Sequence, residues 1–191
     1  RGPFETGRFF RETVPTVRRP EHSKFHSPPL DQLKTRIDVK ALELFRKPLA
    51  EILAEIESPD RHVGGLALEA LAFKLMRILD MRYASTRLRA QATGGAEVDL
   101  IFESDRLVFS RWQIQCKNSG QATVDDIAKE VGIAQVIKAN VILIVCTGKI
   151  GPVAREFARQ AMKETNLYVA LIDGNNMRQL VSSPAEIVDI M

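Results

Sequence analysis

The middle of the chain reads Glu97-Val98-Asp99-Leu100-Ile101 and, a few residues later, Trp112-Gln113-Ile114-Gln115-Cys116-Lys117. Both runs alternate apolar and polar side chains, which is typical of β-strands with one buried face. Ser104-Asp105-Arg106 between them is typical of a turn. The pattern predicts a hairpin whose polar face carries Asp99, Gln115 and Lys117.

The flanking sequence predicts helices on both sides of this hairpin. Upstream, apolar residues recur at helical spacing over residues 65–81, with Gly64-Gly65 opening the element, and a further strand is expected at 83–90. Downstream we expect a helix from Thr123 to about Ala139, a buried strand at 141–146, a helix at 152–163, a strand at 167–172 and a short helix at 175–181. This order predicts an α/β fold with one mixed central sheet flanked by helices.

The N-terminal part differs in character from the rest. Residues 1–30 contain five prolines and show no helical or strand period, so we expect an extended arm or linker. Residues 31–60 form a helical extension that Pro48 should kink or split. Residues 61–191 are then the main domain. The long apolar stripe of the extension packs on that domain or on a second subunit, and core packing is the expectation we prefer.

The composition is that of an ordinary globular protein of 191 residues, with 45% hydrophobic and 27% charged residues. A net charge of +3 permits a nucleic-acid partner without demanding one. The longest apolar run, Val141 to Cys146, is far shorter than the ~20 residues of a membrane span. We therefore expect no membrane contact, a cytoplasmic location, and reduced thiols at Cys116 and Cys146. Nucleotide-binding loops and serine or zinc hydrolase motifs are missing.

The three polar residues of the hairpin have a shared chemical logic. A carboxylate together with an amide or backbone oxygen can hold Mg²⁺, a cation that prefers oxygen ligands. A lysine on the same face, about 7 Å along the strand from Gln115, could orient or deprotonate water and offset phosphate charge. The competing interpretation is that these residues form a polar strand face exposed to solvent. The pattern alone fits both interpretations, so the surrounding sequence has to distinguish them.

The sequence of the hairpin and of the segments around it resembles a known family. The runs from Gly94 to Ile101 and from Trp112 to Asn118 are similar to the core of the Mrr-like branch of the PD-(D/E)XK nucleases, which includes many restriction endonucleases. A glutamate-bearing helix precedes the motif in that branch, and the segment from Gly65 to Phe73 fits it. The segments from Ala139 to Gly148, from Ala154 to Ala161 and from Leu171 to Gly174 also resemble the family, so the similarity covers about residues 64–180.

The resemblance implies a restriction-endonuclease-like core of order α-β-β-β-α-β and a role for each matching residue. Asp99 would be a metal ligand, Lys117 the catalytic lysine, and Glu69 the helix carboxylate that approaches the metal. Gln115 stands where the superfamily more commonly has an acid, so metal binding would lean more on Glu69 and on the backbone carbonyl of Cys116. The cofactor would be Mg²⁺, with Mn²⁺ as a substitute, and the substrate double-stranded DNA.

Several alternatives stay open at this point. The missing acid at position 115 also fits a nuclease-fold module that binds DNA without cutting it. A homodimer is a further option, because cutting both strands of a duplex usually takes two active sites. Target sequence and methylation preference cannot be predicted, and recognition could come from residues 1–60 or from a domain upstream. For other residues near the hairpin we weigh a functional role against a simpler one and prefer the simpler one. The pairs are a metal ligand or a rim charge for Glu97, a phosphate contact or a loop residue for Asn118, ligands or helix-cap charges for Asp125 and Asp126, a DNA contact or a solvated helix charge for Lys129, and a base-stacking platform or a core residue for Trp112, while Gln113 is expected to line the polar face at the far side of the hairpin.

Overall fold

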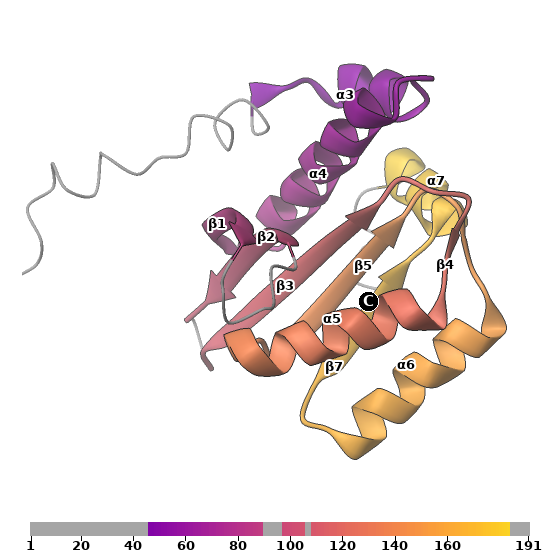
Figure 1. Ribbon diagram of the computed structural model, residues 1–191. Helices are drawn as coiled ribbons and strands as arrows, with labels where there is room; N and C mark the ends of the chain where they lie inside the picture. The colour runs from indigo at the N-terminus through magenta and orange to yellow at the C-terminus, as the bar shows by residue number, and fades with distance from the viewer. Residues whose placement is uncertain (1–45, 90–96, 106–107, 184–191) are drawn as a thin grey trace, which may run out of the picture. The chain divides into compact units, whose positions relative to one another are not determined.

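The computed structural model describes residues 46–89, 97–105 and 108–183 (Figure 1). The expected arm at 1–30 and the first half of the helical extension lie outside these residues. The described elements are α3 Leu49–Ile56, α4 Arg61–Ile78, β1 Arg82–Arg89, β2 Glu97–Ser104, β3 Ser110–Lys117, β4 Gln121–Ala122, α5 Val124–Ile137, β5 Val141–Cys146, β6 Lys149–Ile150, α6 Pro152–Glu164, β7 Tyr168–Ile172 and α7 Gly174–Ser182.

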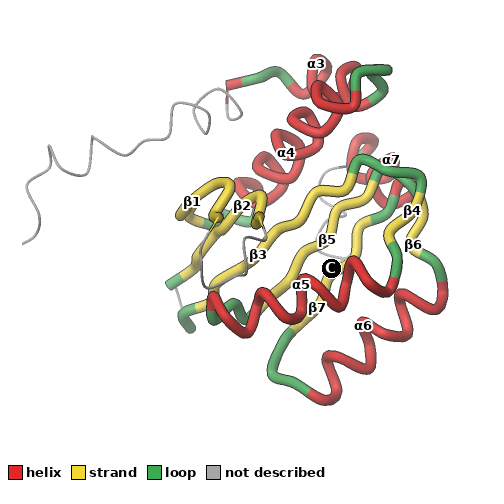
Figure 2. Tube along the Cα trace, viewed as in Figure 1, coloured by secondary structure: helices red, strands yellow, loops and turns green. Residues whose placement is uncertain are grey.

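The central sheet has five strands in the order β1-β2-β3-β5-β7 (Figure 2). β1, β2 and β3 are antiparallel neighbours, whereas β3, β5 and β7 run parallel to one another. The predicted hairpin is confirmed, with Leu100 opposite Ile114 and Phe102 opposite Trp112. The expectation of one mixed sheet flanked by helices is therefore confirmed.

Helices cover both faces of the sheet. One face packs against α3, α4 and α7, around fully buried side chains such as Leu100, Ile114 and Leu143. The other face packs against α5 and α6, around Ile142 and Ile144. Every residue of β5 is buried, as expected for an apolar strand covered on both sides. Residues of β3 thus alternate between the α4 side and the α5 side.

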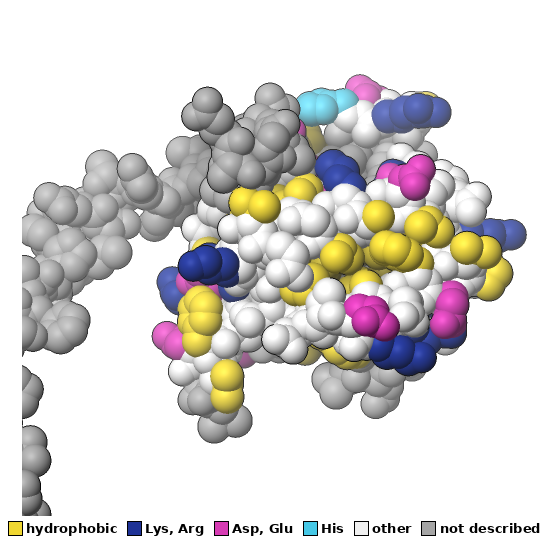
Figure 3. Space-filling view, turned by 60° about the horizontal axis from the view of Figure 1, so that its bottom comes forward, with side chains coloured by type: hydrophobic (Ala, Val, Ile, Leu, Met, Phe, Trp, Pro, Cys, Tyr) yellow, Lys and Arg dark blue, Asp and Glu magenta, His cyan; other side chains and the backbone are white. Residues whose placement is uncertain are grey.

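The α5 and α6 face carries exposed as well as buried apolar groups. Hydrophobic side chains gather in the middle of this face, with acidic and basic side chains around them (Figure 3). Val124, Val131 and Phe157 are only partly buried between the two helices. Among the described helices, none combines the length and apolar character needed to cross a membrane.

The helix before the hairpin begins earlier than predicted. Gly64-Gly65 does not open it, because Asp60 is the N-cap and its side chain accepts a hydrogen bond from His62 N. Gly64 instead lies inside α4, where an added Cβ would be 2.5 Å from Asn118 Nδ2. A helix start depends on a single cap side chain, and Asp60 supplies that cap before the glycines.

Pro48 and α3 show how the helical extension meets the core. Pro48 is the N-cap of α3, so the described helix starts after the proline. Ile52 of α3 is fully buried in the same apolar cluster as α4 and the sheet. The described part of the extension therefore packs on the core.

β1, one edge of the sheet, contains an irregularity. Its register with β2 shifts between Tyr83 and Ser85, which marks a β-bulge. Next to the bulge, the ring of Tyr83 lies 5.4 Å from that of Phe73 and 5.7 Å from that of Phe102. Three aromatic rings from α4, β1 and β2 thus pack together beside this edge.

The loops after β3 and β5 are locked together at the carboxyl end of the parallel strands. β4 and β6, which the sequence did not predict, form a two-residue parallel pair between these loops. Lys149 N donates to Gly120 O at 3.0 Å. A Cβ at Gly148 would lie 2.1 Å from Gly120 O, so the two backbones touch only because Gly148 has no side chain.

We predict that Gly148→Ala lowers the free energy of unfolding by about 1–3 kcal/mol or more, because the new methyl group meets backbone that cannot move aside. Gly132→Ala in α5 is the matched control, since a Cβ there meets nothing within 4 Å. It should raise stability by about 0.5–1 kcal/mol through helix propensity. Urea unfolding followed by circular dichroism measures both, and a Gly148→Ala variant as stable as wild type would contradict the predicted close contact.

Candidate active site

The Asp99 carboxylate lies in a fork between β2 and β3. The last pair of the β2–β3 ladder at this end is Leu100 with Ile114, so Asp99 comes just where the two strands part. Its Oδ2 atom accepts hydrogen bonds from Cys116 N at 2.7 Å and from Gln115 Nε2 at 2.8 Å. Both hydrogen bonds are accepted by Oδ2, and neither involves Oδ1. Where the backbone hydrogen bonds between β2 and β3 end, the Asp99 carboxylate links the two strands through these two contacts.

The environment of Asp99 disfavours its charged form. The pKa of Asp99 is raised to about 7. Burial is the largest cause, and the hydrogen bond from Cys116 N partly opposes it by lowering the pKa. The carboxylates of Glu69, Glu130 and Glu97 raise the pKa further. A partly buried acid among other acids is a place of negative potential, and a cation bound there would relieve it.

Glu69 approaches this fork from α4. It is 9% exposed, and its charge raises the pKa of both Asp99 and the Cys116 thiol. Burial is the largest cause of the raised pKa of Cys116, which fits the packing of this residue against the α4-side core. The structure therefore brings the helix carboxylate near Asp99.

Two further oxygens belong to residues that bind Asp99, namely the side-chain oxygen of Gln115 and the backbone carbonyl of Cys116. Gln115 Oε1 is buried and has no hydrogen-bond partner among the described residues. The carbonyl of Lys117 accepts from Thr147 N at 3.1 Å on the β5 side. Because successive carbonyls of a strand point to opposite sides, the carbonyl of Cys116 points to the β2 side, where Asp99 lies.

Lys117 shares the α5-facing side of β3 with Gln115, but its ammonium forms an ion pair with Asp126 of α5. Among the described residues, no hydrogen bond or ion pair joins Lys117 to Asp99. The hairpin thus brings Asp99 and Gln115 into contact and directs the lysine toward the adjacent helix.

Sequence reasoning missed a second carboxylate of α5. Glu130 is 2% exposed, and its Oε2 atom accepts from Gln113 Nε2 at 2.6 Å. Burial raises its pKa, while Lys129, Gln113 and Lys117 lower it. Gln113 is fully buried, and its Oε1 atom has no hydrogen-bond partner in the part of the chain that the structure describes. The available signal was the position of Glu130 three residues before Ile133, on a helix face that packs against the sheet.

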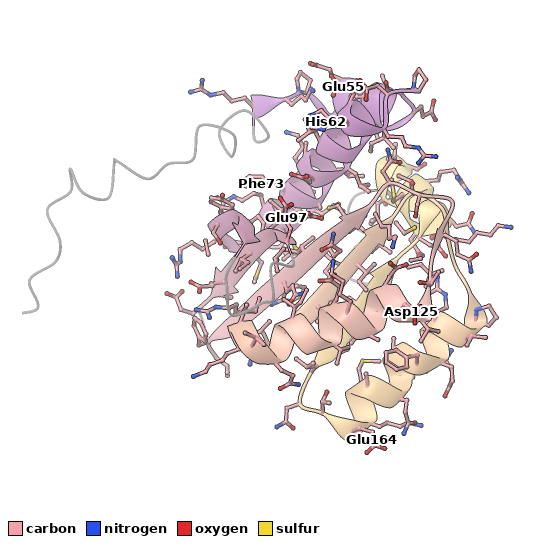
Figure 4. The ribbon with its side chains drawn as sticks, viewed as in Figure 1. Glu55, His62, Phe73, Glu97, Asp125 and Glu164 are labelled. Carbon is pink, nitrogen blue, oxygen red and sulfur yellow. The ribbon has the colours of Figure 1, made fainter. Side chains whose placement is uncertain are left out.

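The residues given simpler roles lie as follows. Asp126 is in the capping box of α5, as predicted for a cap charge, although it also binds Lys117. Asp125, at the start of α5 (Figure 4), is exposed. Trp112 packs against the α4-side core, as expected. Asn118 Oδ1 accepts from Thr147 Oγ1 at 3.1 Å and so links the two locked loops.

The donor set can be tested against a metal ion. Among the described residues no three His, Cys, Asp or Glu side chains form a group that could hold one. The set at the fork is mixed instead: the Asp99 carboxylate, the unpartnered Gln115 Oε1 and a backbone carbonyl, with Glu69 nearby. These are hard oxygen donors, so the residues fit Mg²⁺ or Mn²⁺ better than a softer metal.

The family assignment agrees with this geometry. A restriction endonuclease family model, of the Mrr catalytic type, matches residues 61–181. The matched segment runs from the start of α4 to α7 and includes the whole sheet with Glu69, Asp99, Gln115 and Lys117. No curated protein and no solved structure gives a significant match. The chain belongs to the Mrr-type restriction endonuclease family of nucleases.

The raised pKa of Asp99 predicts a pH dependence of stability in metal-free protein. Between pH 4 and 7 the folded protein keeps a proton on Asp99 that the unfolded chain has released, since the pKa rises from 3.8 to about 7 on folding. The contribution of Asp99 to the free energy of unfolding therefore falls as the pH rises from 4 to 7. The Asp99→Asn variant should gain stability relative to wild type from pH 4 to 7, by at most about 4 kcal/mol, and then level off.

Urea unfolding in EDTA at a series of pH values measures this difference. A carboxyl-carbon NMR titration should show a midpoint near 7 in the wild type that is missing from Asp99→Asn. A constant stability difference between the two proteins over this pH range would show that Asp99 ionises normally.

Proposed function

We propose that this protein is a Mg²⁺-dependent endonuclease that hydrolyses phosphodiester bonds of double-stranded DNA. The observation that carries the proposal is the fork itself, where a partly buried Asp99 carboxylate lies beside a buried amide oxygen of Gln115 that has no hydrogen-bond partner among the described residues. Membership of the restriction endonuclease family supports the reaction class and a DNA substrate. Mn²⁺ should replace Mg²⁺, because both accept the same oxygen ligands.

The ligands we propose are Asp99, Gln115 Oε1, the carbonyl of Cys116 and Glu69. Asp99 Oδ1 takes no part in the two bonds that fix Oδ2, so the side chain is oriented by one oxygen and offers the other. When bound, Mg²⁺ supplies Lewis-acid polarisation of the scissile phosphate and neutralises its developing charge. The amide at position 115 adds no negative charge, so Glu69 supplies the second carboxylate.

Lys117 supplies the ammonium of the site in this proposal. It follows Gln115 by two residues on the same face of β3, at the carboxyl end of the strand. From there it would contact a phosphate oxygen or orient the attacking water. A homodimer would present one such site to each strand of the duplex.

Plasmid cleavage tests the reaction directly. Purified protein with Mg²⁺ should nick or linearise supercoiled plasmid, and differently methylated plasmids should be included because the target is not predicted. Lys117→Ala and Asp99→Ala should each slow cleavage by about a hundredfold or more. Lys163→Ala, which removes an exposed lysine of α6, is the control and should cut like wild type. Equal cleavage by Lys117→Ala and wild type would refute the assignment.

DNA binding without cleavage is the second candidate, favoured by the amide at position 115, where the superfamily more commonly has an acid. Metal titration separates the two candidates. Isothermal calorimetry should show Mn²⁺ binding to the wild type, no binding to Asp99→Asn, and tighter binding to Gln115→Glu because a carboxylate attracts the cation more strongly. A protein whose DNA affinity depends on salt but not on metal, and which binds no Mn²⁺, is a binding module only.

A further inference from the structure

A single carboxylate of α5 serves two structural tasks. Asp126 Oδ2 accepts hydrogen bonds from Thr123 N at 2.7 Å and Thr123 Oγ1 at 2.8 Å, which closes the capping box at the start of α5. Asp126 Oδ1 takes the ammonium of Lys117. The oxygen that builds the helix start and the oxygen that binds the lysine are therefore different atoms of one rigid group.

A second contact fixes α5 against the same face of β3. Glu130 lies one helical turn after Asp126 and holds Gln113 through a 2.6 Å hydrogen bond between two buried side chains. The charge of Lys117 also lowers the pKa of Glu130, so the ammonium acts on Asp126 and on Glu130. Because α5 is attached to β3 at two places, the position of Asp126 relative to Lys117 is set by the fold and not by one flexible side chain.

We propose that Asp126 is the positioning residue for Lys117, an inference that rests on the proposed function. The lysine side chain has four rotatable bonds and loses much conformational freedom when it is held. Asp126 holds its ammonium on the α5-facing side of β3, the side that also carries Gln115. Without this partner the ammonium samples many positions, and a displacement of about 1 Å in a catalytic group can cost about a hundredfold in rate.

Four variants separate positioning from folding. Asp126→Asn keeps an oxygen for the capping box but removes the charge that binds Lys117. Asp126→Glu keeps both functions, because Glu is the favoured third residue of a capping box. Thr123→Ala weakens the helix start without removing the carboxylate. Asp125→Asn removes a charge from the neighbouring exposed residue, which is not part of the cap.

We expect Asp126→Asn to lower kcat for plasmid cleavage by about tenfold to a hundredfold while KM and DNA affinity change less than about twofold. Asp126→Glu should restore kcat to within about threefold of wild type. Asp125→Asn and Thr123→Ala should keep the wild-type kcat, although Thr123→Ala should melt at a lower temperature. An unchanged kcat in Asp126→Asn overturns the proposal, and so does an increased one, which would mean that Asp126 withholds the lysine from the site.

A measurement independent of cleavage keeps this inference distinct from the proposed function. In protein labelled with ¹⁵N-lysine, the Lys117 Nζ signal, assigned from Lys117→Arg, should be visible in wild type and Asp125→Asn but lost to solvent exchange in Asp126→Asn. If the wild type cuts no DNA, the endonuclease proposal fails, and this signal alone decides whether Asp126 holds the ammonium. A Lys117 signal that persists unchanged in Asp126→Asn overturns the inference.

Discussion

The bond between Asp99 Oδ2 and the backbone N–H of Cys116 is the constraint on which the candidate site depends. It forms where the β2–β3 ladder ends, so a side chain replaces the backbone partner that β3 would otherwise lack. This hydrogen bond holds β2 and β3 at a fixed separation at Asp99, although the backbone ladder between the two strands ends at Leu100. Gln115 completes the arrangement from the neighbouring position. The oxygens of the fork are therefore placed by secondary structure, with little freedom left to individual side chains.

The α5-facing side of β3 forms a polar layer inside an otherwise apolar interface. Gln113, Gln115 and Lys117 each meet a carboxylate there, and two of those carboxylates have raised pKa values. Burying such groups is unfavourable unless each finds a partner. The side-chain oxygens of Gln113 and Gln115, which have no partner among the described residues, therefore lower the stability of this layer. An apolar strand face would be more stable at this interface. A costly polar layer beside the fork is typical of a functional site.

The sequence was most informative where the spacing of apolar side chains and the chemistry of the polar side chains indicate the same structure. Alternation along 97–101 and 112–117 predicted the hairpin and the contact between Asp99 and Gln115, and the apolar run at 141–146 predicted the buried strand β5. The direction of Lys117 could not be predicted, because its partner Asp126 is brought to it by the packing of α5 on the sheet. β4 and β6 were missed because two-residue strands have no period. The start of α4 was wrong because Asp60, and not the two glycines, determines it.

The two edges of the sheet have a consequence for how copies of this protein could associate. β1 is interrupted by its bulge near Tyr83, and β7, the opposite edge, has only five residues. A bulged edge does not present an unbroken row of free amide and carbonyl groups, and a short edge presents few of them. Joining two sheets into one continuous sheet is therefore disfavoured within the described residues. For the described residues, side-chain surfaces are the better contacts for self-association, and their use leaves the geometry of each fork unchanged when two copies meet.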